Sequence, residues 1–251
     1  MAERRADVAE AKRRVPVAAL EREAAARRHH SLSDRLRRAP APRIIAEVKK
    51  ASPSAGLLQA FYDPAAVAAE YEACGAIAIS VLTEPRHFLG SEADLRQVRQ
   101  AVGLPILRKD FLCDPYQVCE AAAWGADVVL LIAAALDAAG IRDLHQAAVA
   151  LGLDVIVEIH AADELDAALA CEGAVIGVNS RNLKTLTTDL AIARGLAAAI
   201  PAGRLRIAES GIRRREEIVE LQELGYDGFL IGESLLRGEQ PGRALRRLRA
   251  G

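Results

Sequence analysis

This sequence of 251 residues contains little cysteine, histidine or aromatic residue, and it has no long apolar run. Its four cysteines form no Cys-x-x-Cys pair, and its five histidines lack the spacing of metal ligands. Neither a disulfide framework nor a zinc site is supported, so we expect a reduced, cytoplasmic protein. No apolar run reaches the roughly 20 residues of a membrane-spanning helix, and the N-terminus lacks the apolar core of a signal peptide. We therefore expect no membrane association.

Charge is unevenly distributed along the chain, although the formal net charge is only −1. Residues 1–43 carry twelve basic and six acidic side chains, a net charge of +6, and the remaining 208 residues carry a net charge of −7. A basic arm can bind nucleic acid. Here, however, the arginines alternate with Ala, Glu and Asp at helical spacing, and no aromatic residue accompanies them. We expect solvated helix faces and no nucleic-acid partner.

This N-terminal arm also has an apolar side. Pro16 and the segment 31–34 (Ser-Leu-Ser-Asp) divide the arm into two or three short helices. Because the arm leads straight into the first strand, we predict that one of its helices packs across an end of the main fold. The side chains expected to be buried there are Val15, Val17, Leu20 and Leu36.

From residue 44 onward, strand patterns alternate regularly with helical patterns. A glycine commonly precedes the next strand, as is typical of a helix C-terminus. Eight such units of about 26 residues each predict a closed (β/α)8 barrel. An open doubly wound sheet is the alternative, but no Gly-x-Gly-x-x-Gly follows the first strand. The expected strands are 44–48, 76–82, 104–108, 127–132, 153–158, 174–178, 205–208 and 227–231.

We therefore predict one α/β domain, a (β/α)8 TIM barrel over residues 44–251 with an N-terminal helical extension over residues 1–43. In such barrels the C-terminal ends of the strands form one rim, where the chemistry is located. On the first strand Ile45, Glu47 and Lys49 share one face, because residues two apart project to the same side.

The same period-two pattern places polar residues at the ends of five strands. Each could be a structural ion pair by itself. Two lysines and three glutamates together are hard to explain as structure alone, because burying charges is unfavourable. The pattern therefore predicts an active site. Its members are Glu47 and Lys49, then Lys109, then Glu158, then Asn179 with Arg181, and finally Glu209 with Ser210.

Two glycine turns, at 208–212 (Ala-Glu-Ser-Gly-Ile) and 230–235 (Leu-Ile-Gly-Glu-Ser-Leu), follow the last two strands. The corresponding loops of TIM barrels commonly bind phosphate, because glycine allows backbone N–H groups to approach the anion. At Gly232 we also expect a positive φ. The turns predict a phosphorylated small molecule as the substrate.

The motif set resembles indole-3-glycerol phosphate synthase from about Arg4 to Arg249. The segments that carry the resemblance are 44–54 (Ile-Ile-Ala-Glu-Val-Lys-Lys-Ala-Ser-Pro-Ser), 80–84 (Ser-Val-Leu-Thr-Glu), 88–90 (Phe-Leu-Gly), 107–111 (Leu-Arg-Lys-Asp-Phe), 157–160 (Val-Glu-Ile-His), 177–183 (Gly-Val-Asn-Ser-Arg-Asn-Leu) and the two glycine turns. The resemblance implies a carboxy-lyase of tryptophan biosynthesis. Such enzymes convert 1-(2-carboxyphenylamino)-1-deoxyribulose 5-phosphate to indole-3-glycerol phosphate, and they imply no metal or organic cofactor.

By this resemblance Lys109 is the acid for ring closure. Lys49, Glu47 and Glu158 are the candidates for the dehydration step, and their division of roles stays open. The Glu233 carboxylate should turn to solvent, because it would repel a phosphate. The expected substrate-binding residues are Asn179, Arg181, Glu209, Ser210, Phe88, Phe111 and Leu130, and the expected phosphate-binding residues are Ser52, Gly211, Gly232 and Glu233.

Two other functions remain open at this point. A sugar-phosphate isomerase would share the phosphate turns but would not need the extra lysines. A non-catalytic phosphate-binding barrel would bind the substrate without turnover. We expect a monomer, with a dimer as the alternative.

Overall fold

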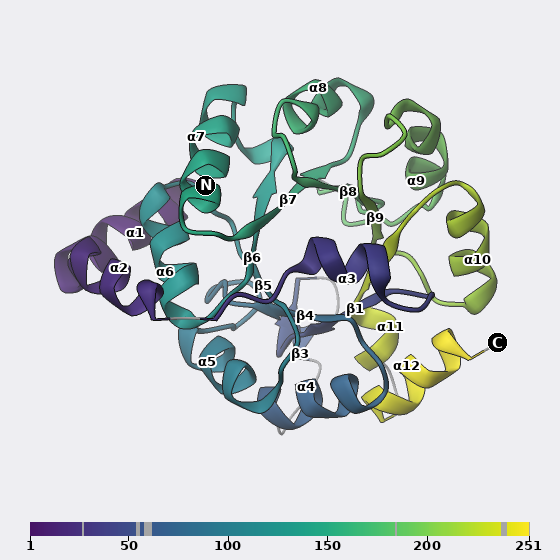
Figure 1. Ribbon diagram of the computed structural model, residues 1–251, viewed down its shortest axis with the longest axis horizontal. Coiled ribbons are helices and arrows are strands. Elements are labelled where there is room, and N and C mark those ends of the chain that lie inside the picture. Colours follow the sequence, from purple (N-terminus) through teal and green to yellow (C-terminus); the bar gives the residue numbers. More distant parts are fainter. Residues whose placement is uncertain (27, 54–55, 58–61, 184, 237–239, 251) are drawn as a thin grey trace.

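Eight parallel strands close into a barrel in the computed structural model, which describes residues 1–26, 28–53, 56–57, 62–183, 185–236 and 240–250 (Figure 1). Each predicted strand is present, with ends shifted by at most two residues. The predicted (β/α)8 barrel is confirmed. In order around the barrel the strands are β1 (Ile44–Val48), β4 (Ala78–Leu82), β5 (Ile106–Lys109), β6 (Val128–Ile132), β7 (Asp154–Ile159), β8 (Val175–Asn179), β9 (Arg206–Glu209) and β10 (Gly228–Ile231), which pairs with β1.

Helices surround the barrel, and their sequences carry the expected start signals. Asp63 and Asp114 cap helices that begin with proline, and their carboxylates accept backbone N–H groups of the first turn. The helices are α4 (Pro64–Ala73), α5 (Glu92–Ala101), α6 (Pro115–Trp124), α7 (Ala138–Ala150), α8 (Leu165–Leu169), α9 (Ala191–Leu196), α10 (Arg215–Glu223), α11 (Glu233–Leu236) and α12 (Pro241–Arg249). Short elements complete the fold: the hairpin β2 (Ala51–Ser52) and β3 (Gly56–Leu57), and the 3₁₀ turns η1 (Ala133–Ala135), η2 (Ala162–Glu164) and η3 (Ala197–Ala199).

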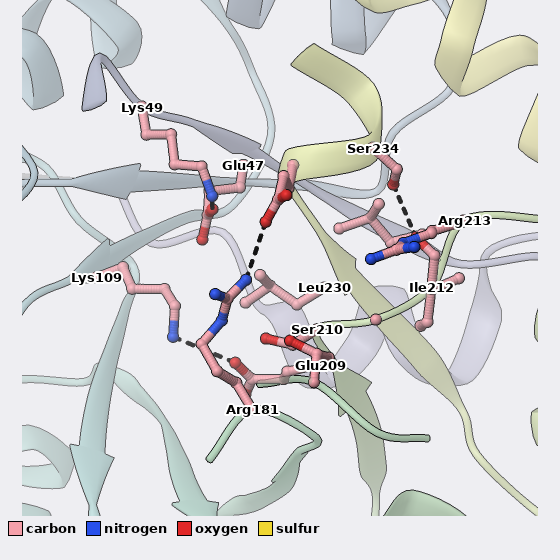
Figure 2. Close-up of a pocket in the computed structure, with 15 residues that line it drawn as sticks. Glu47, Lys49, Lys109, Arg181, Glu209, Ser210, Ile212, Arg213, Leu230 and Ser234 are labelled. Carbon is pink, nitrogen blue, oxygen red and sulfur yellow. Dashed lines mark hydrogen bonds and ion pairs between the residues drawn. The ribbon is translucent and has the colours of Figure 1, made fainter. Parts of the chain in front are cut away.

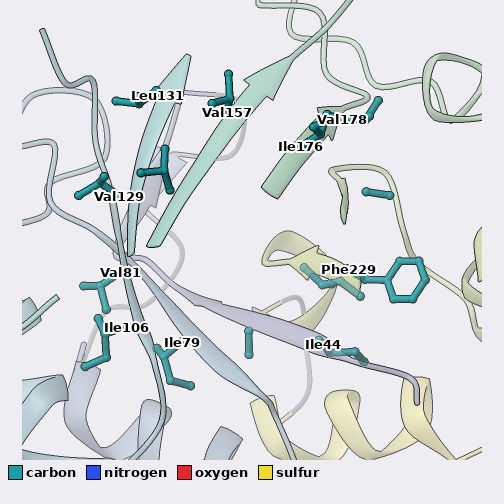
Figure 3. Close-up of a cluster of buried hydrophobic side chains, with 14 of the residues drawn as sticks. Ile44, Ile79, Val81, Ile106, Val129, Leu131, Val157, Ile176, Val178 and Phe229 are labelled. Carbon is teal, nitrogen blue, oxygen red and sulfur yellow. The ribbon is translucent and has the colours of Figure 1, made fainter. Parts of the chain in front are cut away.

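The strands divide the apolar residues between two cores. Ile44, Ala46 and Val48 lie in the layer between barrel and helices, whereas Ile45 points into the barrel. This is the alternation predicted for the first strand. Figure 3 shows the outer layer, in which Val129, Leu131, Val157 and other strand residues face outward.

The N-terminal arm forms three helices, α1 (Ala2–Arg14), α2 (Val17–Ala25) and α3 (Leu32–Arg38). Helix α3 closes the N-terminal end of the barrel, because Leu32 and Leu36 are 0% and 1% exposed and belong to the core inside the barrel (Figure 1). The prediction that an arm helix packs across one end is confirmed. Leu20 is buried as well.

The prediction was wrong for two valines of the arm. Val15 and Val17 are 40% and 45% exposed. Both flank Pro16, which separates α1 from α2, and neither belongs to the buried cluster that Val8 and Leu20 form with Tyr116 and Ala123 of α6.

Among the described residues, no helix combines the length and apolar character needed to cross a membrane.

Candidate active site

A cavity with two adjoining lobes opens at the C-terminal rim of the barrel. The apolar lobe measures about 340 Å³ and the polar lobe about 170 Å³. Five residues line both lobes, so the two form one continuous site: Glu47, Lys49, Lys109, Arg181 and Ser210. Figure 2 shows the polar lobe with these residues labelled. The strand ends predicted to be catalytic therefore meet in space.

Lys109 lies between two buried carboxylates from the opposite side of the barrel. Its Nζ atom is 3.0 Å from Glu158 Oε2 and 3.2 Å from Glu209 Oε2. All three side chains are at least 85% buried, at the ends of β5, β7 and β9. Lys49 forms a second pair nearby, with its Nζ atom 2.6 Å from Glu47 Oε1.

The same cluster separates the proton affinities of its carboxyl groups. Burial raises the pKa of Glu209 to about 8, and repulsion from Glu158 adds to the effect although Lys109 opposes it. Burial also acts on Glu158, but attraction to Lys109 and His160 outweighs it and lowers the pKa of that group. Burial opposes a charge on Lys109, yet Glu158, Glu209 and Glu47 together raise its pKa. The site thus holds the Lys109 ammonium beside an ionised Glu158, and Glu209 binds its proton more strongly than Glu158 does.

Glycine allows two of these carboxylates to approach the barrel backbone. A Cβ atom at Gly177 would collide with Glu209 Oε1, and one at Gly232 would collide with Glu47 Oε1. Gly232 does not have a positive φ, so the expected left-handed backbone is wrong. A glycine is required at position 232 because any side chain there would collide with Glu47.

The polar lobe contains the two glycine turns. Ser210 and Gly211 have φ values of 65° and 84°, which turns the chain sharply after β9. Ser234, at the start of α11, donates from Oγ to the carbonyl oxygen of Ile212 at 2.8 Å and joins the two turns (Figure 2). The lobe is thus a pocket with backbone on both sides, at the rim position typical of phosphate sites.

The apolar lobe is lined by Phe88, Phe111 and Leu130 among others. The loop that carries Phe88 is organised by Glu84, whose carboxylate accepts the N–H groups of Arg86, His87 and Phe88 at 3.0, 2.6 and 3.1 Å. The buried Glu84 carboxylate thus holds an exposed loop in place and positions Phe88 at the cavity without regular secondary structure.

Comparison with known proteins decides the family. The family model described as indole-3-glycerol phosphate synthase matches residues 1–248. The chain is 52% identical over 203 residues to indole-3-glycerol phosphate synthase of Kineococcus radiotolerans, an alignment that covers 81% of this chain and 74% of the relative. It is 50% identical over 205 residues to that of Bordetella pertussis, covering 82% of this chain and 78% of the relative.

The chain belongs to the indole-3-glycerol phosphate synthase family. Solved structures with lower identity support the fold alone. Thiamine phosphate pyrophosphorylase from Pyrococcus furiosus superposes with a TM-score of 0.63 at 16% identity, over 87% of this chain and 96% of that one. An N-acetylmannosamine-6-phosphate 2-epimerase from Clostridium perfringens gives a TM-score of 0.63 at 16% identity, over 82% and 91%.

The family motifs converge on the cavity. Every residue predicted for the site lines one lobe or both: Glu47, Lys49, Lys109, Glu158, Asn179, Arg181, Glu209, Ser210, Phe88, Phe111, Leu130, Ser52, Gly211, Gly232 and Glu233. Ser52 lines the apolar lobe, away from the two glycine turns with which it was grouped. Ser54, the last residue of the first motif, lies outside the described residues.

Glu233 differs from its expected orientation. Its Oε2 atom is 3.0 Å from Arg181 Nη2, so the carboxylate faces the site and does not turn to solvent. The reason is electrostatic, because Arg181 extends across the mouth of the polar lobe and attracts it. Arg181 thus has an anionic partner before any substrate binds.

Sequence reasoning missed several lining residues. Arg213 directly follows the first glycine turn and Ser234 lies within the second, so their position at a predicted anion site was an available signal. Leu183 and Leu186 line the apolar lobe from the loop after β8, where no periodicity marks them.

Proposed function

We propose that this chain binds 1-(2-carboxyphenylamino)-1-deoxyribulose 5-phosphate and converts it to indole-3-glycerol phosphate, with release of carbon dioxide and water. One observation carries the proposal: Lys109 is held between Glu158 and Glu209, at the junction of an apolar lobe and a polar lobe. The apolar lobe suits an aromatic ring, and the glycine turns of the polar lobe suit a phosphate.

Ring closure needs an acid at the ketone oxygen. The ring carbon that bears the carboxylate attacks the ketone carbon, and the developing alkoxide takes a proton from the Lys109 ammonium. Loss of carbon dioxide then returns the electron pair to the ring. Because Glu158, Glu209 and Glu47 surround the amine and raise its pKa, it stays protonated until this step.

Dehydration needs an acid for the departing hydroxyl group and a base for a carbon-bound proton. Glu158 is ionised and available as a base, and Lys49 with Glu47 forms a second proton-carrying pair. The division of roles between these groups stays open. Because its pKa is raised, Glu209 in its protonated form is able to donate a hydrogen bond to a substrate hydroxyl as well as accept one.

Asn179 and Arg181 are proposed to hold the substrate carboxylate. The planar guanidinium suits a bidentate grip on a carboxylate. Since Arg181 is paired with Glu233 in the structure, substrate binding exchanges one carboxylate partner for another. Backbone N–H groups of the two turns are left for the phosphate, whereas Ser52 reaches the site from the adjoining apolar lobe.

A turnover assay tests the activity. The purified chain, without added metal, should convert the ribulose phosphate substrate with indole fluorescence and release of carbon dioxide. Loss of substrate without either product would favour the isomerase. Calorimetric binding with no turnover would favour a non-catalytic barrel.

Substitution at Gly232 should weaken phosphate binding. Gly232→Val, and already Gly232→Ala, places a side chain against the Glu47 carboxylate and blocks approach to the turn. We expect at least about a tenfold rise in KM, a lower kcat because Glu47 is displaced from Lys49, and weaker inhibition by inorganic phosphate. Gly195→Ala is the matched control, since nothing lies within 4 Å of its Cβ position. Unchanged inhibition by phosphate in a folded Gly232→Ala variant would place the anion elsewhere.

The pH dependence should follow the two buried glutamates. As pH rises through about 8, Glu209 loses its proton, so kcat/KM should fall as a second negative charge forms beside Glu158. Glu209→Gln stays neutral and should lose this alkaline limb. Persistence of the limb in Glu209→Gln would assign it to another group.

Stability should show the same linkage. Because folding raises the pKa of Glu209, this group adds to the free energy of unfolding at pH values below 4.5, its ordinary pKa. That stabilising contribution is lost as the pH rises to about 8. Glu158 has the opposite pH dependence because folding lowers its pKa. Its stabilising contribution is present above pH 4.5 and is lost as the pH falls below that value. From these two groups we expect the highest melting temperature at mildly acidic pH.

A further inference from the structure

His160 lies directly behind Glu158, where β7 passes into the 3₁₀ turn η2. Residues two apart on a strand share a face, so the imidazole projects to the same side as the Glu158 carboxylate. Its Nε2 atom lies 3.4 Å from Glu158 Oε1, and its Nδ1 atom lies 3.6 Å from Glu164 Oε2. The side chain is 12% exposed and stands outside the cavity lining. The ring is therefore wedged between two carboxylates, one of them in the active site.

Both ring nitrogens are buried, and neither makes a hydrogen bond to any residue in the described part of the chain. Buried polar atoms are nearly always paired, so this arrangement calls for an explanation. Glu164 fixes the turn, because its Oε2 atom accepts the His160 backbone N–H at 2.7 Å. A small rotation of the ring brings a nitrogen within hydrogen-bond distance of either carboxylate, and a protonated ring donates from both nitrogens.

The groups form an alternating row across the barrel rim: Glu164 on η2, His160 and Glu158 on β7, Lys109 on β5 and Glu209 on β9. Glu158 uses Oε2 for Lys109 and presents Oε1 to His160. Each oxygen of this carboxylate thus faces a different nitrogen group, which leaves it little freedom to rotate.

We propose that His160 is a positioning residue that holds the Glu158 carboxylate with one oxygen toward Lys109 and, when protonated, supplies it with a second positive charge. The inference rests on the proposed function, in which Glu158 is a base. The lowered pKa of Glu158, to which Lys109 and then His160 contribute, agrees with this geometry. Without His160 the carboxylate would keep Lys109 as its only cationic neighbour among these groups.

Two substitutions separate positioning from charge. His160→Leu removes both the positioning contact and the charge. We expect kcat to fall about 10- to 100-fold and KM to change less than about threefold, because a misplaced group affects the chemical step more than binding. The acidic limb of the pH profile of kcat/KM should move up by about one unit, because Glu158 loses a cation. His160→Gln keeps a donor near the Nε2 position but carries no charge, so it should restore most of kcat while the limb stays displaced.

The matched control is His145→Gln, a surface histidine whose Nε2 atom contacts only the Glu172 carbonyl oxygen among described residues. It should leave kcat and the pH profile unchanged. Wild-type kcat with an unshifted acidic limb in both His160 variants would overturn the proposal, even if their melting temperatures fall. If His160→Leu fails to fold, the position of the acidic limb in the pH profile of His160→Gln tests the proposal by itself.

A measurement without turnover keeps this proposal distinct from the proposed function. At fixed pH, the ¹⁵N resonances of the His160 ring should shift in Glu158→Gln relative to the wild type, because the carboxylate beside Nε2 is lost, and those of His145 should not change. Unchanged His160 resonances would overturn the pairing. Absence of turnover in the wild type would instead overturn the proposed function.

Discussion

Replacing Lys109 with alanine should lower kcat by at least about 10²–10⁴-fold while leaving substrate binding largely intact. Lys109 faces the cavity from β5 and is the ammonium held between Glu158 and Glu209. The glycine turns and Arg181 are on other strands, so the groups proposed to bind phosphate and carboxylate remain. Single-turnover kinetics and calorimetry with the substrate measure the two quantities separately.

Lys109→Ala also leaves Glu158 and Glu209 together without their cation, so the variant must be checked for folding by circular dichroism. Lys12→Ala is the control, because Lys12 pairs with Asp114 at the surface and neither residue lines the cavity. Exposed pairs contribute little, so this variant should behave like the wild type. Near-normal turnover by Lys109→Ala would exclude Lys109 as the acid.

Deleting residues 1–38 should destabilise the protein severely. The deletion removes Leu32 and Leu36, which fill the N-terminal end of the barrel core. Truncation of a buried leucine costs about 2–5 kcal/mol, so losing two approaches the total stability of a typical domain, about 5–15 kcal/mol. Thermal unfolding of the truncated chain measures the loss. An unchanged melting temperature would show that α3 is dispensable.

A shorter deletion, of residues 1–25, isolates the role of the outer helices. It keeps α3 but removes Arg4, whose Nη2 atom is 2.6 Å from Asp110 Oδ2. Asp110 follows Lys109 directly, and its other oxygen accepts the backbone N–H of Phe111 at 2.8 Å. We expect a folded protein with raised KM and a moderately lower melting temperature.

Residues 1–25 carry six basic and five acidic side chains, a net charge of +1, so the rise in KM should come mainly from loss of the Arg4–Asp110 ion pair and should depend little on salt. The point variant Arg4→Ala should reproduce part of the kinetic effect, and Lys12→Ala should not. Wild-type kinetics of the shorter chain in low salt would leave α1 and α2 without a role at the site.

The local pattern of the chain predicts its architecture well. The alternation of strand and helix signals, repeated eight times, predicted the closed barrel, because hydrophobic period and glycine position are properties of neighbouring residues. Period two within a strand also placed Glu47 and Lys49 on one face and predicted which strand ends carry polar groups. These inferences hold because each involves residues only a few positions apart.

The tertiary structure decided everything that depends on distant residues. Lys109 meets Glu158 and Glu209 across 49 and 100 residues of chain, and only their distances and burial raise the pKa of Glu209 while lowering that of Glu158.

The same holds for the features that sequence reasoning placed incorrectly. Glu233 turns to Arg181, 52 residues away, and Gly232 is required by Glu47 on a neighbouring strand. The sequence by itself determined which residues reach the rim of this barrel. Their partners, and therefore their charges, were decided by closure of the barrel, because electrostatic and steric contacts depend on distance in space and not on separation along the chain.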